Sequence, residues 1–350
     1  MILMYDVIII GSGQAGLSMG YYLKKTALSF AIIDQNTRIG DTWRNRYDSL
    51  TLFTPPLYSS LPGLMLKKER NCMPTKDDIA DYLENYAKTF SLPVQLGIHV
   101  KNVAKVDNFF SVETNKGVIE ARNLVVATGP FHTPRIPSFA KKLSKDIVQL
   151  HSASYKNPSQ LKDGNVLVVG AGNSGAQIAV ELANTHETYL STSGKLRFLP
   201  LFIMNKNIFW WFDKLGILKA TRDSFIGRKL QLYGDPIFGT ELKTKMSAGL
   251  VHLKDRTKAP KENEVIFADA STLKVDNIIW ATGFKPNYAW LNLPSLVDKQ
   301  GNIIHTRGIT HEKGVFFLGL PWQYRRGSSL LEGVGKDAHY LYQHLLTHIR

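Results

Sequence analysis

The chain has 350 residues, of which 44% are hydrophobic and 21% charged, so it is long enough for two globular domains. Its net charge of +14 comes from scattered Lys and Arg residues without a nucleic-acid-binding motif, which argues against a nucleic-acid partner. No apolar run reaches the roughly 18 residues of a membrane-spanning helix, and the single cysteine, Cys72, has no partner for a disulfide or a CxxC redox pair. We therefore expect a cytoplasmic protein without an integral membrane segment or a metal site.

The N-terminal region reads as a strand, a glycine-rich turn and a helix. Gly11, Gly13 and Gly16 form a GxGxxG motif between the apolar run VIII and the helical pattern LSMGYYLKK. In this context the motif binds a dinucleotide, because the first glycine permits the tight turn, the second admits the pyrophosphate and the third lets helix and strand pack. The next predicted strand, SFAIID, ends at Asp34, whose carboxylate can bind a ribose hydroxyl.

The same pattern recurs in the second half of the chain. VLVV leads into Gly170, Gly172 and Gly175, and the helical pattern AQIAVELAN follows. Counting as from Gly16 to Asp34, the position after Gly175 that corresponds to Asp34 is Ser193, with no acidic residue in reach. Each half also ends in an Ala-Thr-Gly motif (127–129 and 281–283), preceded by an alternating, hairpin-like stretch. The sequence therefore predicts an α/β fold with two Rossmann-like domains, each holding one nucleotide cofactor.

Residues 199–250 interrupt the second repeat and are rich in Phe, Trp, Leu and Lys at loosely helical spacing. This helical insert can be interpreted in three ways. It could be a lid at the substrate entrance, an amphipathic surface that touches a membrane, or a helical subdomain packed on its own core or on a homodimer partner.

GDTWR (40–44) followed by RYDSL (46–50) resembles flavin-containing monooxygenases, including plant YUCCA-type enzymes and the bacterial flavoproteins labelled CzcO. The resemblance continues through VATGPFHTPRIPSF (126–139), VQLHSASYKNP (148–158), IIWATGFKPN (278–287) and the C-terminal segment 314–341. It implies a glutathione-reductase-type architecture in which the second domain is inserted in the first. The FAD-binding domain would then comprise residues 1–157 and 284–350, and the NAD(P)H-binding domain residues 158–283.

The resemblance also implies the cofactor contacts. For FAD and its surroundings these are Gly11, Gly13, Gln14, Ala15, Gly16, Asp34, Gln35, Asp41, Thr42, Trp43, Arg44, Thr54, Val103 (through its backbone, to adenine), Ala127, Thr128, Gly129, Gln323 and Leu330. In the second domain they are Gly170, Gly172, Asn173, Ser174, Gly175, Ser193, Lys195, Ala281, Thr282 and Gly283. Two of these residues have simpler interpretations, since Trp43 could be a core aromatic residue and Arg44 a surface cation.

The implied activity is that of an NAD(P)H-using monooxygenase. Reduced flavin would react with O2, and the resulting C4a-peroxyflavin would oxygenate a small soft nucleophile such as a sulfide or an amine, or else a ketone. Two alternatives remain open: an NAD(P)H oxidase or flavin reductase that releases hydrogen peroxide, and a redox-sensing accessory flavoprotein. A thiol-based disulfide reductase is excluded within the single chain, because Cys72 is its only cysteine.

The sequence departs from the family at three places. In the FxGxxxHxxxY fingerprint, His151 and Tyr155 are present, but Lys145 and Ile147 replace the Phe and Gly. We interpret His151 as a hinge residue and His132 as a loop residue rather than a catalyst.

The other departures concern the flavin side and the nicotinamide side. Phe53 occupies the flavin-side position of a catalytic Asn in the classical enzymes, and a phenyl ring cannot form the hydrogen bond of an amide. The 2′-phosphate site offers only Thr192, Ser193 and Gly194, with Lys195 beyond them. We therefore expect the protein to use both NADPH and NADH.

Overall fold

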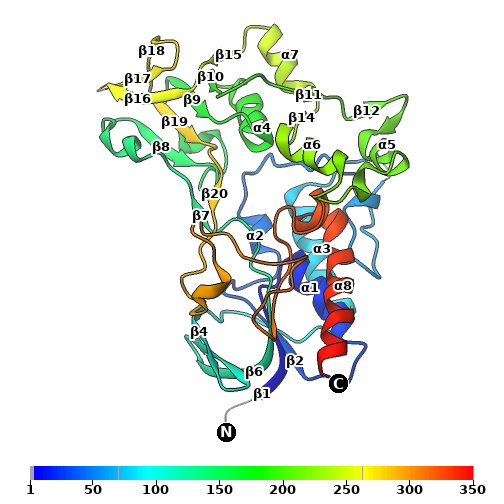
Figure 1. Ribbon diagram of the computed structural model, residues 1–350. Coiled ribbons are helices and arrows are strands. Elements are labelled where there is room, and N and C mark those ends of the chain that lie inside the picture. Colours follow the sequence, from blue (N-terminus) through cyan, green and yellow to red (C-terminus); the bar gives the residue numbers. More distant parts are fainter. Residues whose placement is uncertain (1–3, 70, 262, 350) are drawn as a thin grey trace.

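The computed structural model describes residues 4–69, 71–261 and 263–349. Two α/β units lie one above the other in Figure 1, with the insert beside the upper unit and the C-terminal helix alongside the lower one. Each unit has a core of parallel strands covered by helices, as expected for the predicted α/β fold class. Within the described residues no helix combines the length and the apolar character needed to cross a membrane.

The first unit contains a seven-stranded sheet of order β3-β2-β1-β6-β5-β4, with β21 also paired to β6. Its parallel part is buried on both faces, which explains the uninterrupted apolar run of β1. The predicted hairpin is confirmed as the antiparallel pair β5 and β6. The strands are β1 (Met4–Ile10), β2 (Phe30–Ile33), β3 (Val94–Gln95), β4 (Val100–Val106), β5 (Phe109–Thr114), β6 (Gly117–Val126) and β21 (Val315–Phe317).

Helices α1, α3 and α8 cover one face of this sheet with a shared apolar core, and the segment around Tyr288 and Leu296 covers the other. Helix α3 begins with a capping box in which Thr75 and Asp78 satisfy each other's backbone N–H groups. The elements are α1 (Gln14–Leu23), α2 (Asp41–Arg44), α3 (Lys76–Thr89) and α8 (Leu331–Ile349), with 3-10 turns η1 (Pro56–Tyr58), η5 (Pro294–Leu296) and η6 (Arg326–Ser329).

The second unit is built on a five-stranded parallel sheet of order β15-β10-β9-β19-β8. Helices α4 and α7 pack on one face, and the predicted hairpin is confirmed as the antiparallel strands β17 and β18, extended by β16. The elements are β8 (Val148–His151), β9 (Asn165–Val169), α4 (Asn173–Leu182), β10 (Glu187–Ser191), α7 (Glu241–Ser247), β15 (Val251–Lys254), β16 (Thr257–Lys261), β17 (Glu264–Phe267), β18 (Thr272–Lys274) and β19 (Asn277–Trp280), with 3-10 turns η2 (Ser138–Lys142) and η3 (Pro158–Gln160).

The sheet pairing corrects one predicted boundary. Strand β8 pairs along its full length with β19, and the preceding residues Ala140, Leu143 and Ile147 pack into the core of the second unit. The second unit therefore begins well before residue 158, and the first crossing between the units is β7 (Thr133–Pro134). The return crossing is β20 (Phe284–Lys285), which pairs antiparallel with β7 (Figure 1).

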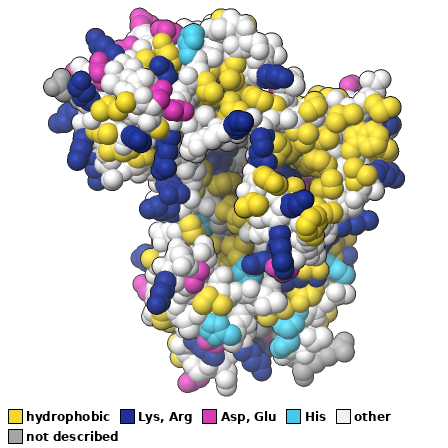
Figure 2. All heavy atoms as spheres, turned by 45° about the horizontal axis from the view of Figure 1, so that its top comes forward, with side chains coloured by type: hydrophobic (Ala, Val, Ile, Leu, Met, Phe, Trp, Pro, Cys, Tyr) yellow, Lys and Arg dark blue, Asp and Glu magenta, His cyan; other side chains and the backbone are white. Residues whose placement is uncertain are grey.

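The insert has a small core of its own, formed by Ile208, Phe209, Leu218 and Phe238, and it also contacts the first unit. Its last helix, α7, packs instead on α4 through Leu242, so residues 241–250 belong to the second unit. The remaining elements are β11 (Phe198–Leu199), β12 (Phe202–Ile203), β13 (Lys206–Asn207), α5 (Ile208–Lys214), the 3-10 turn η4 (Ile217–Lys219), α6 (Phe225–Tyr233) and β14 (Ile237–Phe238). Figure 2 shows hydrophobic side chains gathered on the lobe at its right, with Lys and Arg around them.

Candidate active site

The first glycine loop is shaped by contacts that exclude any side chain at two of its three glycines. Gly11 has a φ of +109°, and a Cβ there would lie 2.5 Å from the carbonyl oxygen of Ala127. A Cβ at Gly16 would lie 1.9 Å from the carbonyl oxygen of Gly11. At Gly13 a Cβ would meet no atom within 4 Å, and this residue begins α1 without a side-chain cap. The N-terminus of α1 is therefore open, as binding of a phosphate requires.

The second loop repeats this geometry. Gly170 has a φ of +106°, and its Cβ would lie 2.4 Å from the carbonyl oxygen of Ala281. A Cβ at Gly175 would lie 1.9 Å from the carbonyl oxygen of Gly170, whereas Gly172 has open space and begins α4 uncapped. In both halves the carbonyl group of the alanine in the Ala-Thr-Gly motif lies against the first glycine of the loop. The sequence repeat is thus a repeat of two matching phosphate cradles.

The carboxylate of Asp34 lies beside the first loop. Its Oδ2 accepts hydrogen bonds from the backbone N–H and the hydroxyl of Ser12, at 2.6 and 2.8 Å. Its Oδ1 accepts from the backbone N–H and the side-chain amide of Asn36, both at 2.8 Å. These bonds fix the carboxylate next to the turn where a ribose adjoining the pyrophosphate would lie.

In the second half of the chain, the structural counterpart of Asp34 lies one residue before Ser193, the position predicted from the sequence. The Gly11 N–H donates to the carbonyl of Ile33, and the Gly170 N–H donates to the carbonyl of Ser191. The residue after Ile33 is Asp34, so its equivalent is Thr192 rather than Ser193. Thr192 forms hydrogen bonds with the backbone of Gly194, while Ser193 and Lys195 are exposed beyond it.

Two residues expected to wall the flavin are occupied elsewhere. Arg44 binds Asp81 at 2.8 Å and Glu84 at 3.0 Å, both on α3. Asp41 accepts a hydrogen bond from the backbone N–H of Arg38. The Arg44 side chain ties α2 to α3, so it is not a free surface cation, whereas the Asp41 carboxylate bonds to the backbone just before α2.

The other residues predicted near the flavin lie in different surroundings. Trp43 is partly exposed and packs against the core shared by α1, α3 and α8, whereas Thr42 and Gln35 are exposed. Thr54 is buried, and its hydroxyl lies 2.8 Å from the hydroxyl of Ser59.

Val103 and Gln323 use their polar groups within the protein. Val103 is fully buried, its N–H donates to the carbonyl of Trp290, and its carbonyl accepts from Asn292, so it has no free N–H for adenine. The buried amide of Gln323 accepts from the N–H of Leu320 and donates to the carbonyl of Arg307. Gln323 therefore positions the C-terminal segment. That segment reaches the first loop, where Gln14 donates to the carbonyl of Ser329.

Phe53 lies against the insert. Its ring stacks on Phe238 at 4.4 Å between ring centres and on Phe209 at 5.9 Å. The backbone N–H of Phe238 in turn donates to Asn173, whose side chain also donates to Pro236. The amide of Asn173 is therefore used to hold the insert rather than left free for a nucleotide. Strand β14 lies between Phe53 and the start of α4.

Two neutral histidines hold the crossings between the units. His151 Nδ1 accepts from the N–H of Ala153, so its proton lies on Nε2, 3.0 Å from the carbonyl oxygen of Gly283. His132 Nδ1 accepts from the N–H of Asn287, and its Nε2 lies 3.1 Å from the Thr128 hydroxyl. Burial lowers the pKa of both side chains. Each histidine thus joins an Ala-Thr-Gly motif to a crossing segment.

Arg46 is a residue whose role sequence reasoning missed, although it lies in the quoted RYDSL motif. Its guanidinium lies 4.8 Å from the ring centre of Phe131 and 5.4 Å from that of Phe284, each two residues or fewer beyond an Ala-Thr-Gly motif. Burial lowers its pKa, and none of the described carboxylates forms a salt bridge with it. An arginine within two residues of a GDTWR-type motif was the available signal.

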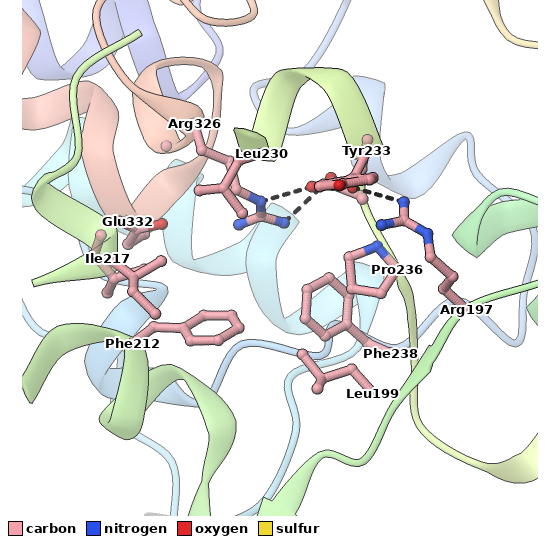
Figure 3. Close-up of a pocket in the computed structure, with 14 residues that line it drawn as sticks. Arg197, Leu199, Phe212, Ile217, Leu230, Tyr233, Pro236, Phe238, Arg326 and Glu332 are labelled. Atoms are coloured by element: carbon pink, nitrogen blue, oxygen red, sulfur yellow. Dashed lines mark hydrogen bonds and ion pairs between the residues drawn. The ribbon is translucent and has the colours of Figure 1, made fainter. Parts of the chain in front are cut away.

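A cavity of about 190 Å³ lies between the insert and the start of α8 (Figure 3). Arg326 and Glu332 of the C-terminal segment line this cavity, together with the rings of Phe212 and Phe238 (Figure 3). Neither Arg326 nor Glu332 was expected from the sequence as a site residue.

Two glycine loops of matching geometry, each at the carboxyl end of parallel strands, are typical of oxidoreductases with two dinucleotide sites. Residues 8–196 match the pyridine nucleotide-disulphide oxidoreductase family. An uncharacterized oxidoreductase named CzcO from Bacillus subtilis is 53% identical over 97% of this chain and 98% of its own length. The chain belongs to this family and groups with the CzcO oxidoreductases.

More distant matches point the same way. The probable indole-3-pyruvate monooxygenase YUCCA9 of Arabidopsis thaliana is 26% identical over 84% of this chain and 78% of its own length. A flavin-containing monooxygenase structure from Stenotrophomonas maltophilia superposes with a TM-score of 0.84 at 27% identity, covering both chains completely. The protein is accordingly a flavin-dependent oxidoreductase.

Proposed function

We propose that the protein is an FAD-dependent monooxygenase that oxygenates small organic molecules, with FAD on the first loop and NAD(P)H on the second. The observation that carries this proposal is the pair of matching cradles, in which Gly13 and Gly172 leave open space in front of uncapped helices. The flavin monooxygenases among the similar proteins support the activity. The single cysteine leaves no thiol pair for disulfide reduction.

The two loops have different tasks in this proposal. The N–H groups at the start of α1 bind the FAD pyrophosphate, and Asp34 accepts a hydrogen bond from the ribose. The start of α4 binds the second pyrophosphate, where the exposed Ser174 adds a hydroxyl. Thr192 and Lys195 receive the 2′ end of either nucleotide. Neither residue is acidic, so neither repels the 2′-phosphate of NADPH, and the Thr192 hydroxyl can form a hydrogen bond with the 2′-hydroxyl of NADH.

Bound flavin supplies the redox chemistry, since it accepts hydride from the nicotinamide and activates oxygen. The chain supplies position and exclusion of water. Tyr47 donates to Gln177 on α4 at 2.8 Å, and Gln177 donates to the carbonyl of Thr51, so these bonds hold the second unit against the flavin-side segment. Burial raises the pKa of Tyr47 to about 12, which keeps its hydroxyl a donor at neutral pH.

Phe53 favours a second candidate function, that of an NAD(P)H oxidase. Its ring is stacked on insert aromatic residues and offers no hydrogen-bond donor at the flavin side. Without such a donor, reduction of oxygen would end in hydrogen peroxide more often than in oxygenation.

The experiment measures NADPH consumption, hydrogen peroxide and product in parallel, with the purified FAD-loaded protein and thioanisole or phenylacetone. Oxygenated product formed while peroxide falls supports the monooxygenase. Peroxide equal to all NADPH consumed supports the oxidase, and tight nucleotide binding with negligible turnover supports an accessory flavoprotein. Cys72→Ser is the matched control, because the exposed Cys72 has no role in either reaction and its loss should leave turnover unchanged.

A further inference from the structure

The cavity in Figure 3 has mostly apolar walls. The insert supplies Leu199, Phe212, Ile217, Leu230 and Phe238, and the C-terminal segment supplies Arg326 and Glu332. A dry apolar cavity of about 150 Å³ is enough to hold benzene. At about 190 Å³, this one has room for a single ring with a short side chain.

The cavity is joined by direct contacts to both dinucleotide loops. Phe238 donates its N–H to Asn173 at the start of α4, and its ring stacks on Phe53. Arg326 opens the turn η6, and Ser329 at the end of that turn accepts a hydrogen bond from Gln14 of the first loop. The cavity therefore lies where the two cofactor sites and the insert meet.

Two buried polar atoms in this cavity have no partner among the described residues. Nε and Nη2 of Arg326 bind Asp235 at 2.7 and 3.2 Å, but Nη1 is buried without a hydrogen bond. Oε2 of Glu332 is buried and equally unpartnered. Such atoms cost free energy unless a ligand satisfies them.

The chemistry of these atoms selects among ligands. Nη1 is a donor and needs an acceptor. Burial raises the pKa of Glu332, so its carboxyl group carries a proton more readily than usual and can donate as well. An ammonium group has only donors and cannot satisfy Nη1, and a thioether sulfur is only a weak acceptor. Because Asp235 already balances the charge of Arg326, the acceptor can be neutral or anionic.

We propose that this cavity is the substrate site and that it takes an apolar molecule ending in a carbonyl or carboxylate oxygen, which accepts a hydrogen bond from Arg326. The assignment as substrate site rests on the proposed monooxygenase function. Binding of such a molecule in the cavity does not depend on that function, so the test measures binding in the absence of turnover.

The test is calorimetric titration of the FAD-loaded protein, without nicotinamide, with four molecules of similar size. Phenylacetone and phenylacetate carry the acceptor, whereas phenethylamine and benzyl methyl sulfide do not offer a comparable one. We expect at least one of the first two to bind more than about tenfold tighter than both others. Which of the two binds identifies the acceptor as ketone or carboxylate. Equal or tighter binding of the amine or the sulfide overturns the proposal.

Variants locate the binding. Leu230→Trp should fill the cavity and weaken the preferred ligand more than about tenfold while FAD content stays unchanged. Arg326→Met should reduce its affinity to that of the sulfide, whereas Glu332→Gln should preserve it, since an amide still donates. Unchanged binding in Leu230→Trp overturns the site. Where that variant loses FAD, Ile217→Phe fills the opposite wall and is judged by the same criterion.

The failure of this proposal is distinguishable from the failure of the proposed function. Product formation by wild-type protein with unaltered turnover in Leu230→Trp would leave the monooxygenase intact and place its substrate elsewhere. Tight binding lost in Leu230→Trp, without any oxygenated product, would keep the cavity and reject the monooxygenase.

Discussion

His151 Nε2 donates to the carbonyl oxygen of Gly283 across 3.0 Å, so the end of β8 holds the second Ala-Thr-Gly motif in place. Because Nδ1 of the same ring accepts from Ala153, the imidazole must be neutral. A second proton would point at a backbone N–H.

This bond makes stability depend on pH. Burial lowers the pKa of His151 below its ordinary value of 6.5, so the unfolded chain takes up a proton that the folded chain resists. The contribution of His151 is complete above 6.5 and is lost as the pH falls toward the lowered pKa. In urea unfolding at pH 7.5, His151→Gln should cost about 1 kcal/mol. The gap to wild type should narrow at pH 5.5, and a gap that widens would contradict this. His311→Gln, at an exposed position, is the control.

Alanine substitutions in the second glycine loop should separate packing from ligand access. Gly175→Ala places a methyl group 1.9 Å from a backbone oxygen, and overpacking of this kind costs about 1–3 kcal/mol or more. Gly172→Ala meets no protein atom, so its melting temperature should stay close to that of wild type. It should still weaken NADPH binding, because the methyl group enters the pyrophosphate path. Melting curves and NADPH titrations check both, and equal destabilisation by the two would refute the assigned geometry.

The preference for NADPH over NADH tests whether Thr192, rather than Ser193, is the counterpart of Asp34. For wild type, kcat/KM with NADPH and NADH should differ by less than about 100-fold, or about 2.7 kcal/mol. An aspartate at the position equivalent to Asp34 repels a 2′-phosphate and accepts from a 2′-hydroxyl. Thr192→Asp should therefore favour NADH more strongly than Ser193→Asp. The reverse order would restore Ser193 as the counterpart.

Replacing Phe53 should change the share of the consumed NADPH that ends as hydrogen peroxide. Phe53→Asn introduces a hydrogen-bonding amide, and we expect the share of NADPH that ends as peroxide to fall. Phe53→Leu keeps the site apolar and should leave that share unchanged. Each variant loses the stacking on Phe238, at about 0.5–1.5 kcal/mol, so both are compared at equal FAD occupancy. A peroxide share that is the same in both would show that the position does not control oxygen.

The sequence was sufficient for the features that are local and repeated. The glycine loops, the flanking strands and helices and the two hairpins all depend on neighbours within a short stretch of chain. Strand β8 could not be assigned in this way, because its partner β19 follows only after the whole second unit has been traversed. The equivalence of Asp34 and Thr192 was missed because the distance from the first glycine is 23 positions in one half (11 to 34) and 22 in the other (170 to 192).

The candidate site was predictable in its outline but not in the partners of each side chain. A motif fixes the residue type at a position, whereas the carboxylates that capture Arg44 come from α3, and the backbone that satisfies Val103 comes from Trp290 and Asn292. Likewise Arg326 and Glu332 become notable only because folding buries them next to the insert without enough partners.

The pairing of Thr133 with Lys285 brings the two ends of the second unit together at one place on the first. A domain whose two ends lie side by side can be inserted into a loop of another domain, or removed from it, while the strands of that other domain keep their positions. The order of the gene, which splits one domain around another, thus requires no rearrangement of the host fold. We therefore expect that the second unit can be replaced by that of a relative while the fold of the first unit stays unchanged.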